Sequence, residues 1–461
     1  MDNKLYVIIL LVSSFFIHFL FFGRPNEVVF DEVWYGRHVN DYINGTFHFD
    51  GHPPLGRMTI GGFAKVMGYQ PESSFANISE KFPDRQYLIL RFLPTLAGAV
   101  LPLIIYLIIR ELGMTPFAAF AGSMLIVLEN GFVAQSRLLL MDSSLILYEF
   151  ASLFFYLRYR NHKKIYMLFL TSIFGGLAFA VKWVGLSFVA LPILFEGLGI
   201  LSEMKRKGIS VLKSSRTWLA FTALVITPFV VYFSAVTAYS LILHKSGTGD
   251  AFMSTGYQKT LQGNGYQNNL DIKTPNIFSK FYELNRQMYA VNQALTASHP
   301  YSSRWYTWPL MIRPIYYWVQ GNARIYFIGN PIIWWSSTIA VLYVLSIIAY
   351  KLWLKLRRYD ISSSLLNSSN LLTILITGYV MNLLPFIGVK RVMFLYHYLA
   401  AYIFAVLMLV YLISKQKNSK QIFGVLLMIS AIAFIFFAPL TYGLDLSPKA
   451  YELRVWFESW R

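Results

Sequence analysis

Two adjacent acids, Asp31 and Glu32, follow the first long apolar stretch of the chain. A carboxylate at the edge of a membrane can accept the proton of a hydroxyl nucleophile. Neighbouring residues of a helix point about 100° apart, so the two carboxyl groups are not expected to face each other and share a proton. We expect one acid to act as the base and the other to serve the acceptor or the structure. The alternative is a helix N-terminus with acids in its first turn, which the helix dipole favours.

A rigid turn follows at His52-Pro53-Pro54. The prolines are expected to be structural, whereas His52 can hydrogen-bond a substrate or cap the backbone. Asp31, Glu32, His52 and Asp142 are also oxygen and nitrogen ligands that could meet around a divalent cation. Their spacing is not specific for any metal, so we predict no metal site and leave a divalent cation as an alternative.

The composition is that of a polytopic membrane protein. Of the 461 residues, 56% are hydrophobic and only 13% are charged, against about 25% charged residues in soluble proteins. The net charge of +18 would indicate nucleic acid in a soluble chain, but basic residues also mark cytoplasmic loops, and no nucleic-acid partner is predicted. The absence of cysteine excludes disulfides and thiolate metal sites.

Hydropathy predicts an all-α fold with about eleven spans, each near the ~20 residues that cross a bilayer. The spans are Leu5–Phe22, Leu88–Ile109, Thr115–Leu128, Ser143–Leu157, Ile165–Val181, Val184–Leu201, Trp218–Leu243, Ile332–Tyr350, Leu371–Ile387, Phe394–Ile413 and Ile422–Leu440. Residues 1–243 form an N-terminal transmembrane module that includes an outer loop at 23–87. Residues 244–331 form a second outer loop, and residues 332–461 the C-terminal helices with an outer tail.

Basic residues between the spans predict the orientation. With a cytoplasmic N-terminus, the cytoplasmic loops carry Arg158, Arg160, Lys163 and Lys164, then Lys205, Arg206, Lys207, Lys213 and Arg216, then Lys351, Lys355, Arg357 and Arg358, then Lys415, Lys417 and Lys420. The opposite orientation would violate the positive-inside rule in all of these loops. We therefore interpret the first span as a retained signal anchor, with a cleaved signal peptide as the alternative.

The two outer loops contain helical segments of their own. Phe30–Ile43 and Pro54–Met67 are predicted to be short surface helices, the second with proline in its first turn. The second loop begins with a Gly-, Ser- and Asn-rich stretch to Asn269, interpreted as a mobile loop, and continues as a polar and aromatic helix at Phe278–Leu295.

A few charges remain after the cytoplasmic loops are assigned, and all of them fall on the outer side with Asp31. The cations are Arg91, Arg137, Lys182, Lys390 and Arg391. Short outer loops should be poor in Lys and Arg, and a group of cations at the hydrocarbon edge suits an anionic lipid headgroup. Taken singly, each cation more often extends to the phosphates of membrane lipids; their common side favours a phosphate pocket.

The chain resembles the protein O-mannosyltransferases, membrane enzymes of the GT-C glycosyltransferase class. The resemblance is carried by Phe30-Asp31-Glu32-Val33, Phe49-Asp50-Gly51-His52-Pro53-Pro54-Leu55-Gly56-Arg57, Arg91, Glu129-Asn130, Gln135-Ser136-Arg137, Asp142-Ser143, Val181-Lys182-Trp183-Val184-Gly185, His299-Pro300-Tyr301, Trp308-Pro309, Gly329-Asn330-Pro331, Trp334-Trp335 and Arg391 with Phe394-Leu395-Tyr396-His397-Tyr398. These motifs cover nearly the whole chain, and they are specific in combination.

The resemblance implies transfer of mannose from polyprenyl (dolichyl) phosphate mannose to Ser or Thr of secreted or membrane proteins, with inversion at the sugar. It assigns Asp31 as the base, with Glu32 assisting at the acceptor site. Arg91, Arg137, Lys182 and Arg391 are the expected ligands of the lipid phosphate, and His52, Asp142 and His397 are expected to bind the acceptor or support the site. Partners would be the lipid donor, the acceptor protein and membrane lipids, with an oligomer left open.

Two features depart from the eukaryotic pattern. Eukaryotic members insert a β-trefoil MIR domain in the second outer loop, whereas residues 244–331 number about 88, too few for that domain beside a helix. Arg57 also stands where Lys is frequent. We therefore expect a bacterial or archaeal form, in the plasma membrane of a prokaryote with its active site on the outer face.

Three other functions are compatible with the sequence. A different GT-C enzyme would move another sugar onto a lipid or cell-wall acceptor, but the His-Pro-Pro-Leu-Gly and Lys-Trp-Val-Gly combinations favour the protein mannosyltransferases. A transporter of lipid-linked sugars would show inverted repeats and midplane charges, and neither is seen. A non-catalytic scaffold would not depend on Asp31.

Overall fold

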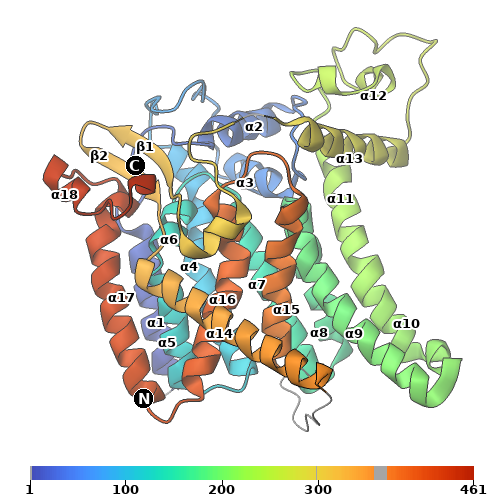
Figure 1. The fold of residues 1–461 in the computed structure, drawn as a ribbon. Helices are drawn as coiled ribbons and strands as arrows, with labels where there is room; N and C mark the ends of the chain where they lie inside the picture. The colour runs from blue at the N-terminus through green and yellow to red at the C-terminus, as the bar shows by residue number, and fades with distance from the viewer. Residues whose placement is uncertain (1–2, 297, 358–370) are drawn as a thin grey trace.

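The computed structural model describes residues 3–296, 298–357 and 371–461; Arg358 of the predicted basic loops lies outside these ranges. Long helices run side by side along the molecule, with the N-terminus at one end and the C-terminus at the other (Figure 1). In the N-terminal part these helices are α1 (Asn3–Phe19), α4 (Tyr87–Glu111), α5 (Pro116–Val127), α6 (Asn130–Ser136), α7 (Asp142–His162), α8 (Ile165–Val181), α9 (Leu186–Lys207), α10 (Ser215–Phe221) and α11 (Thr227–Ile242). The C-terminal part adds α14 (Pro331–Leu356), α15 (Leu371–Leu383), α16 (Leu399–Ser414) and α17 (Ser419–Tyr442).

The predicted apolar segments coincide with these helices to within a few residues. In the part of the chain that the structure describes, seven helices are long and apolar enough to cross a membrane, or eight if α5 and α6 form one bent span. α1 and α8 are apolar but shorter. The structure therefore shows a polytopic helical protein and does not confirm the count of about eleven spans.

The bend between α5 and α6 measures 63° and is fixed by one buried acid. The Glu129 carboxylate accepts hydrogen bonds from the backbone N–H of Gly131 at 3.2 Å and of Asn330 at 3.0 Å, and from the Tyr402 hydroxyl at 2.7 Å. It therefore caps α6 and ties that helix to the start of α14 and to α16. The Glu129 carboxyl group therefore has a structural role.

A layer of short elements covers the end of the bundle opposite the N-terminus (Figure 1). It contains α2 (Glu32–Asn44), α3 (Leu55–Val66), α12 (Thr255–Lys259), α13 (Ile277–Ala294) and α18 (Pro448–Glu452). The predictions of surface helices at 30–43, 54–67 and 278–295 are confirmed by α2, α3 and α13. The stretch before Asn269, predicted as a mobile loop, contains α12, which the Ser254 side chain caps.

One element departs from the all-α prediction. β1 (Ile315–Gln320) and β2 (Ala323–Phe327) form an antiparallel hairpin, and its turn contains Gly321 at φ 56°, a conformation that glycine adopts without strain. The strands are rich in aromatic and β-branched residues, which favour strands. A search for apolar runs of membrane length does not detect segments this short.

Candidate active site

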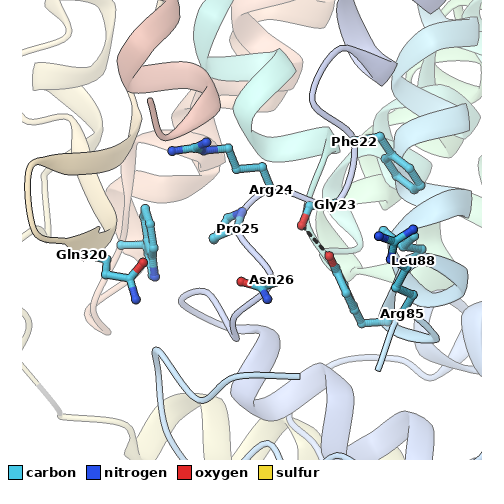
Figure 2. Close-up of a pocket in the computed structure, with 10 residues that line it drawn as sticks. Phe22, Gly23, Arg24, Pro25, Asn26, Arg85, Leu88 and Gln320 are labelled. Carbon is cyan, nitrogen blue, oxygen red and sulfur yellow. Dashed lines mark hydrogen bonds between the residues drawn. The ribbon is translucent and has the colours of Figure 1, made fainter. Parts of the chain in front are cut away.

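Two hollows at this end of the molecule differ in chemistry. The first has a volume of about 530 Å³ and is lined by Phe22, Gly23, Arg24, Pro25, Asn26, Arg85, Tyr87, Leu88, Trp318 and Gln320 (Figure 2). It contains none of the residues predicted for the site, and no carboxylate lines it to act as a base. Arg24 is engaged by the Gly443 carbonyl oxygen at 2.8 Å and by Asp445 at 3.4 Å. We therefore place the candidate active site elsewhere.

The second hollow, which we call the α7–α13 cavity, has a volume of about 280 Å³. It is lined by His52, Asp142, Leu145, Ile146, Glu149, Lys182, Trp183, Val184, Tyr289, Asn292, Gln293, Asn382, Phe386, Gly388, Val389, Lys390, Arg391, Met393, Tyr396, His397, Leu399 and Ala400. Five residues predicted for the site meet here: His52, Asp142, Lys182, Arg391 and His397. The lining combines cationic side chains, which suit an anionic headgroup, with aliphatic side chains, which suit a hydrocarbon chain.

Asp31 lies at the N-terminus of α2 and is not itself part of the cavity lining. Phe30 holds a left-handed backbone at φ 48° and stacks on Tyr317 with ring centroids 4.5 Å apart. Among the described residues, the Asp31 carboxylate has no hydrogen-bond partner in the structure, although it lies within electrostatic range of Lys182 and Asp142. It is an unengaged carboxylate next to a cation-lined hollow.

The charge environment tunes Asp31 for proton transfer. Burial raises the pKa of Asp31 to about 7, and Lys182 opposes that rise. Asp142 and Asp50 raise it further, because nearby negative charge disfavours ionisation. A base works best when its pKa lies near the operating pH, so Asp31 is suited to accept a proton in neutral solution.

Asp142 and Lys182 form an ion pair in the cavity wall. The Lys182 Nζ lies 2.7 Å from Asp142 Oδ1, and Asp142 Oδ2 accepts from Gln135 Nε2 at 2.9 Å. The ammonium also faces the Tyr396 ring at 5.4 Å. Asp142 opens α7 and Lys182 follows α8, and these two helices pack against each other, so the bundle brings the pair together.

The turn before α3 holds His52 at the cavity. Asp50 Oδ1 accepts from the His52 backbone N–H at 2.6 Å, and Asp50 Oδ2 lies 2.5 Å from the Arg57 guanidinium. Arg57 also donates to the carbonyl oxygens of His52 and Pro53. Arg57 therefore stabilises the turn, and these contacts occupy its guanidinium group.

This arrangement keeps His52 neutral. Burial lowers the pKa of His52 to about 3, and the cations Lys182 and Arg391 add to the effect while Asp50 opposes it. Although burial acts to raise it, the pKa of Asp50 itself is held well below its ordinary value by Arg57. Asp50 is consequently a fixed anion, and the His52 imidazole can accept or donate a hydrogen bond without carrying charge.

Arg391 is held by α13, a contribution that the sequence did not predict. Arg391 donates to Asn292 Oδ1, and Asn292 Nδ2 donates to the Gly51 carbonyl oxygen at 2.6 Å. Asn292 therefore joins Arg391 to the turn that carries His52. Tyr289, Asn292 and Gln293 share one face of α13 at spacings of three and four residues. This spacing of polar residues is the sequence feature from which a contribution of α13 to the cavity could have been predicted.

His397 supports the cavity with its ring. Its Nδ1 lies 3.0 Å from the Phe394 carbonyl oxygen, and the ring stacks on Tyr396 at 4.6 Å and on Trp308 at 6.0 Å. Aromatic neighbours therefore fix the orientation of the ring, and the prediction that His397 binds the acceptor or supports the site stays a prediction.

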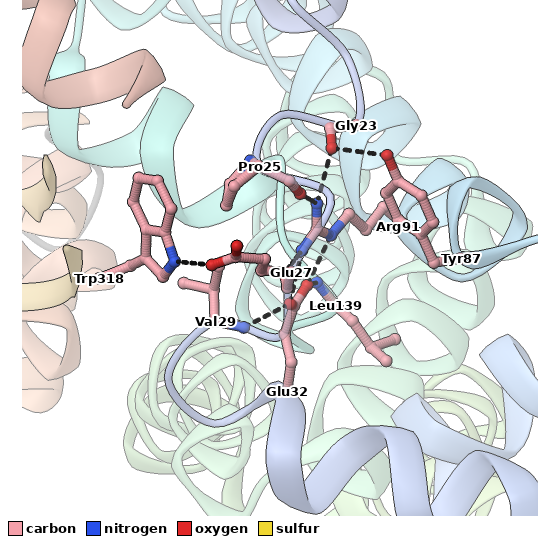
Figure 3. A network of polar contacts seen from close by, with 9 residues as sticks. All are labelled: Gly23, Pro25, Glu27, Val29, Glu32, Tyr87, Arg91, Leu139 and Trp318. Carbon is pink, nitrogen blue, oxygen red and sulfur yellow. Dashed lines mark hydrogen bonds and ion pairs between the residues drawn. The ribbon is translucent and has the colours of Figure 1, made fainter. Parts of the chain in front are cut away.

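Glu32 and Arg91 form a buried pair (Figure 3), and neither residue lines the cavity. Arg91 Nε and one terminal nitrogen donate to the two Glu32 oxygens at 2.7 and 2.6 Å. The remaining N–H groups of Arg91 reach the carbonyl oxygens of Gly23, Pro25 and Glu27. All five guanidinium N–H groups are thus engaged, and the geometry does not support the predicted role of Arg91 at the lipid phosphate.

Both carboxylate oxygens of Glu32 are likewise occupied by hydrogen bonds. Besides Arg91, its oxygens accept the backbone N–H of Val29 and of Leu139, each at 2.8 Å (Figure 3). Its side chain is 0% exposed. The acid therefore joins α2 to α4 and to the segment before α7, and the geometry favours a structural role over the predicted role at the acceptor.

Arg137 also lies outside the cavity lining. It donates to the Phe21 carbonyl oxygen and faces the Tyr442 ring at 4.5 Å. Of the four predicted phosphate ligands, the structure brings together only Lys182 and Arg391. Among the described residues, no group of three or more His, Asp or Glu is arranged to hold a metal ion.

The fold matches solved membrane glycosyltransferases. The Saccharomyces cerevisiae protein O-mannosyltransferase Pmt1-Pmt2 complex, bound to its sugar donor, aligns with a TM-score of 0.89 at 20% identity over 100% of this chain and 93% of that chain. The Archaeoglobus fulgidus oligosaccharyltransferase aligns at 0.54 and 14% identity, over 98% of this chain and 57% of that one. ArnT from Cupriavidus metallidurans, bound to undecaprenyl phosphate, aligns at 0.52 and 15%, over 95% and 64%. The fold is therefore of the GT-C class.

The sequence matches two family descriptions: dolichyl-phosphate-mannose-protein mannosyltransferase over residues 8–244, and the C-terminal four-TMM region of protein O-mannosyltransferase over residues 277–460. Dolichyl-phosphate-mannose–protein mannosyltransferase 1 of Candida albicans is 33% identical over 55% of this chain and 30% of its own length. Enzyme 4 of Schizosaccharomyces pombe is 30% identical over 64% and 39%. The chain spans about a third of the length of the curated relatives it matches. By these matches, this chain belongs to the dolichyl-phosphate-mannose–protein mannosyltransferase family.

Proposed function

We propose that this protein transfers mannose from a polyprenyl (dolichyl) phosphate mannose to Ser or Thr hydroxyls of acceptor proteins. The observation that carries the proposal is the unengaged Asp31 carboxylate beside a cavity that combines the cations Lys182 and Arg391 with aliphatic side chains. A base for a hydroxyl and a site for a lipid phosphate are thereby adjacent. Membership of the family supports mannose as the sugar and a protein as the acceptor.

The chemistry follows from this arrangement. The acceptor O–H gives its proton to Asp31 as its oxygen bonds to C1 of mannose from the side opposite the phosphate. The bond between C1 and the phosphate oxygen breaks, and its electron pair leaves with the lipid phosphate. Lys182 and Arg391 stabilise the charge that develops there. A single displacement of this kind inverts the configuration at C1.

The orientation is proposed from charge. The ends of α7, α9 and α14, with the start of α17, lie at the end of the bundle that holds the N-terminus (Figure 1), and these carry the basic clusters found by sequence. Positively charged ends face the cytoplasm, which puts the α7–α13 cavity on the outer face. The short segment 244–331 supports a prokaryotic form in the plasma membrane.

A transfer assay tests the function. Purified protein is incubated with polyprenyl phosphate mannose and a Ser/Thr peptide, and the peptide is examined by mass spectrometry. Addition of one hexose at a Ser or Thr is expected, and the same peptide with alanine at those positions should stay unmodified. An unmodified peptide, with transfer from another lipid-linked sugar to a lipid acceptor, would instead support the competing GT-C activity.

Removal of the Arg391 charge should weaken use of the donor. A hydrogen bond to a charged group contributes about 1.5–3 kcal/mol, so Arg391→Met is expected to raise the KM for the lipid donor roughly 10- to 100-fold, with a smaller effect on the KM for the peptide. Arg304→Met is the matched control, because Arg304 is exposed and outside the cavity lining. A change confined to the peptide KM would assign Arg391 to the acceptor.

A further inference from the structure

Glu149 is a buried acid for which the proposed chemistry has not yet given a role. It lies on α7 two helical turns beyond Asp142 and lines the α7–α13 cavity with Leu145 and Ile146. Its side chain is buried, and neither carboxyl oxygen has a hydrogen-bond partner among the described residues. Such groups are rare in native proteins, and each one calls for a physical explanation.

Two other polar groups of the cavity wall have partners within the protein. Asp142 binds Lys182 and Gln135, and Asn382 accepts from the Ser187 hydroxyl at 2.8 Å while donating to the Gly378 carbonyl oxygen. Among the described residues that line the cavity, Glu149 alone has buried side-chain oxygens without a partner. A ligand atom in the cavity could therefore satisfy this buried carboxyl group.

The direction of the side chain favours a ligand near Lys182. Seven residues along a helix correspond to roughly 10 Å, and long helical side chains point back toward the helix N-terminus. The Glu149 carboxyl group is thereby directed toward Asp142 and Lys182, and both lie within electrostatic range of it. A group held at Lys182 would come between the ammonium and Glu149.

The chemistry then selects the kind of ligand. A carboxylate buried without a cation or donor is costly, and such a group holds a proton, which makes Glu149 a hydrogen-bond donor in need of an acceptor. A phosphate monoester or diester in the cavity supplies acceptor oxygens, and the aliphatic lining suits the first isoprene unit. We propose that Glu149 binds the lipid donor by donating a hydrogen bond from its neutral carboxyl group to a phosphate oxygen. The identity of the ligand depends on the proposed function.

The test compares two variants that differ in donor capacity. Binding of polyprenyl monophosphate without sugar is measured by the thermal stabilisation of the detergent-solubilised full chain across a lipid titration. Glu149→Gln keeps an N–H donor and should bind within about 3-fold of the wild type. Glu149→Leu removes the donor and should weaken binding at least about 10-fold, the equivalent of one hydrogen bond to a charged group. Glu149→Met, which keeps the length of the side chain, repeats the comparison if the leucine variant does not fold.

Glu196→Gln is the matched control, because this α9 acid hydrogen-bonds to Tyr156 and Tyr159 and is absent from the cavity lining. Wild-type binding by both Glu149→Leu and Glu149→Met would overturn the proposal. So would a Gln variant as weak as the Leu variant, since that result requires an ionised acceptor at this position. The probe carries no sugar, so failure of mannose transfer would refute the proposed function without touching this result.

Discussion

Asp31→Asn is expected to lower kcat for mannose transfer about 10²- to 10⁴-fold, the usual contribution of a general base. Asparagine has nearly the same shape, but its amide cannot accept the hydroxyl proton. The folded state should be retained, because the Asp31 carboxylate has no hydrogen bond to lose among the described residues. The measurement is the rate of hexose addition to a Ser/Thr peptide at saturating lipid donor, together with the elution profile of the purified variant.

Asp271→Asn is the matched control, since Asp271 is exposed in the segment between α12 and α13. The same assignment predicts the pH dependence of the wild type. A base must be deprotonated to act, so with the pKa of Asp31 raised to about 7, kcat/KM should rise as pH increases from 6 to 8 and level off above. A carboxylate with its ordinary pKa would give a flat profile there. A flat profile, or transfer by Asp31→Asn near the wild-type rate, would remove Asp31 from the base role.

The sequence located the elements well because each prediction depended on local properties. Apolar length placed the helices, and polar or proline-rich stretches placed α2, α3 and α13. The sequence also placed Lys182 and Arg391 at the same end of the helices, and both line the α7–α13 cavity. The hairpin was not predicted because its strands, of six and five residues, are much shorter than the apolar segments on which the prediction was based.

The directions of the side chains could not be predicted in the same way. A position near the end of an apolar segment fixes the level of Arg91 or Arg137 along the bundle, but not which neighbours each side chain faces around the helix axis. Glu32 meets Arg91 across 59 residues and the backbone of Leu139 across 107. Such distant partners are set by the packing of the whole bundle. A shared outer side therefore predicted one phosphate pocket where the structure has two separate clusters.

Because the two clusters are separate, substitutions of Asp31 and Glu32 should have opposite effects. Asp31→Asn should lower activity and leave stability unchanged, whereas Glu32→Gln should lower stability and leave most of the activity. Glu32→Gln is expected to destabilise the protein by about 3–5 kcal/mol, the usual cost of breaking a buried ion pair from one side. Each Glu32 oxygen accepts one Arg91 N–H and one backbone N–H. An amide nitrogen at either position would face two donors, and the buried Arg91 would lose its counter-charge.

The measurement is the fraction of monodisperse protein that survives heating in detergent. It is compared with the wild type and with Glu72→Gln, a change of an exposed acid between α3 and α4. Glu32→Gln should lose its folded fraction at a clearly lower temperature. The protein that remains folded should keep much of its kcat, because both Glu32 oxygens are already bound by Arg91 and backbone N–H groups. If Glu32→Gln were instead as stable as the wild type and inactive, the acid would belong to the reaction and the separation of the two clusters would be wrong. The pair Asp31→Asn and Glu32→Gln thus distinguishes a proton acceptor from the buried ion pair next to it in the chain.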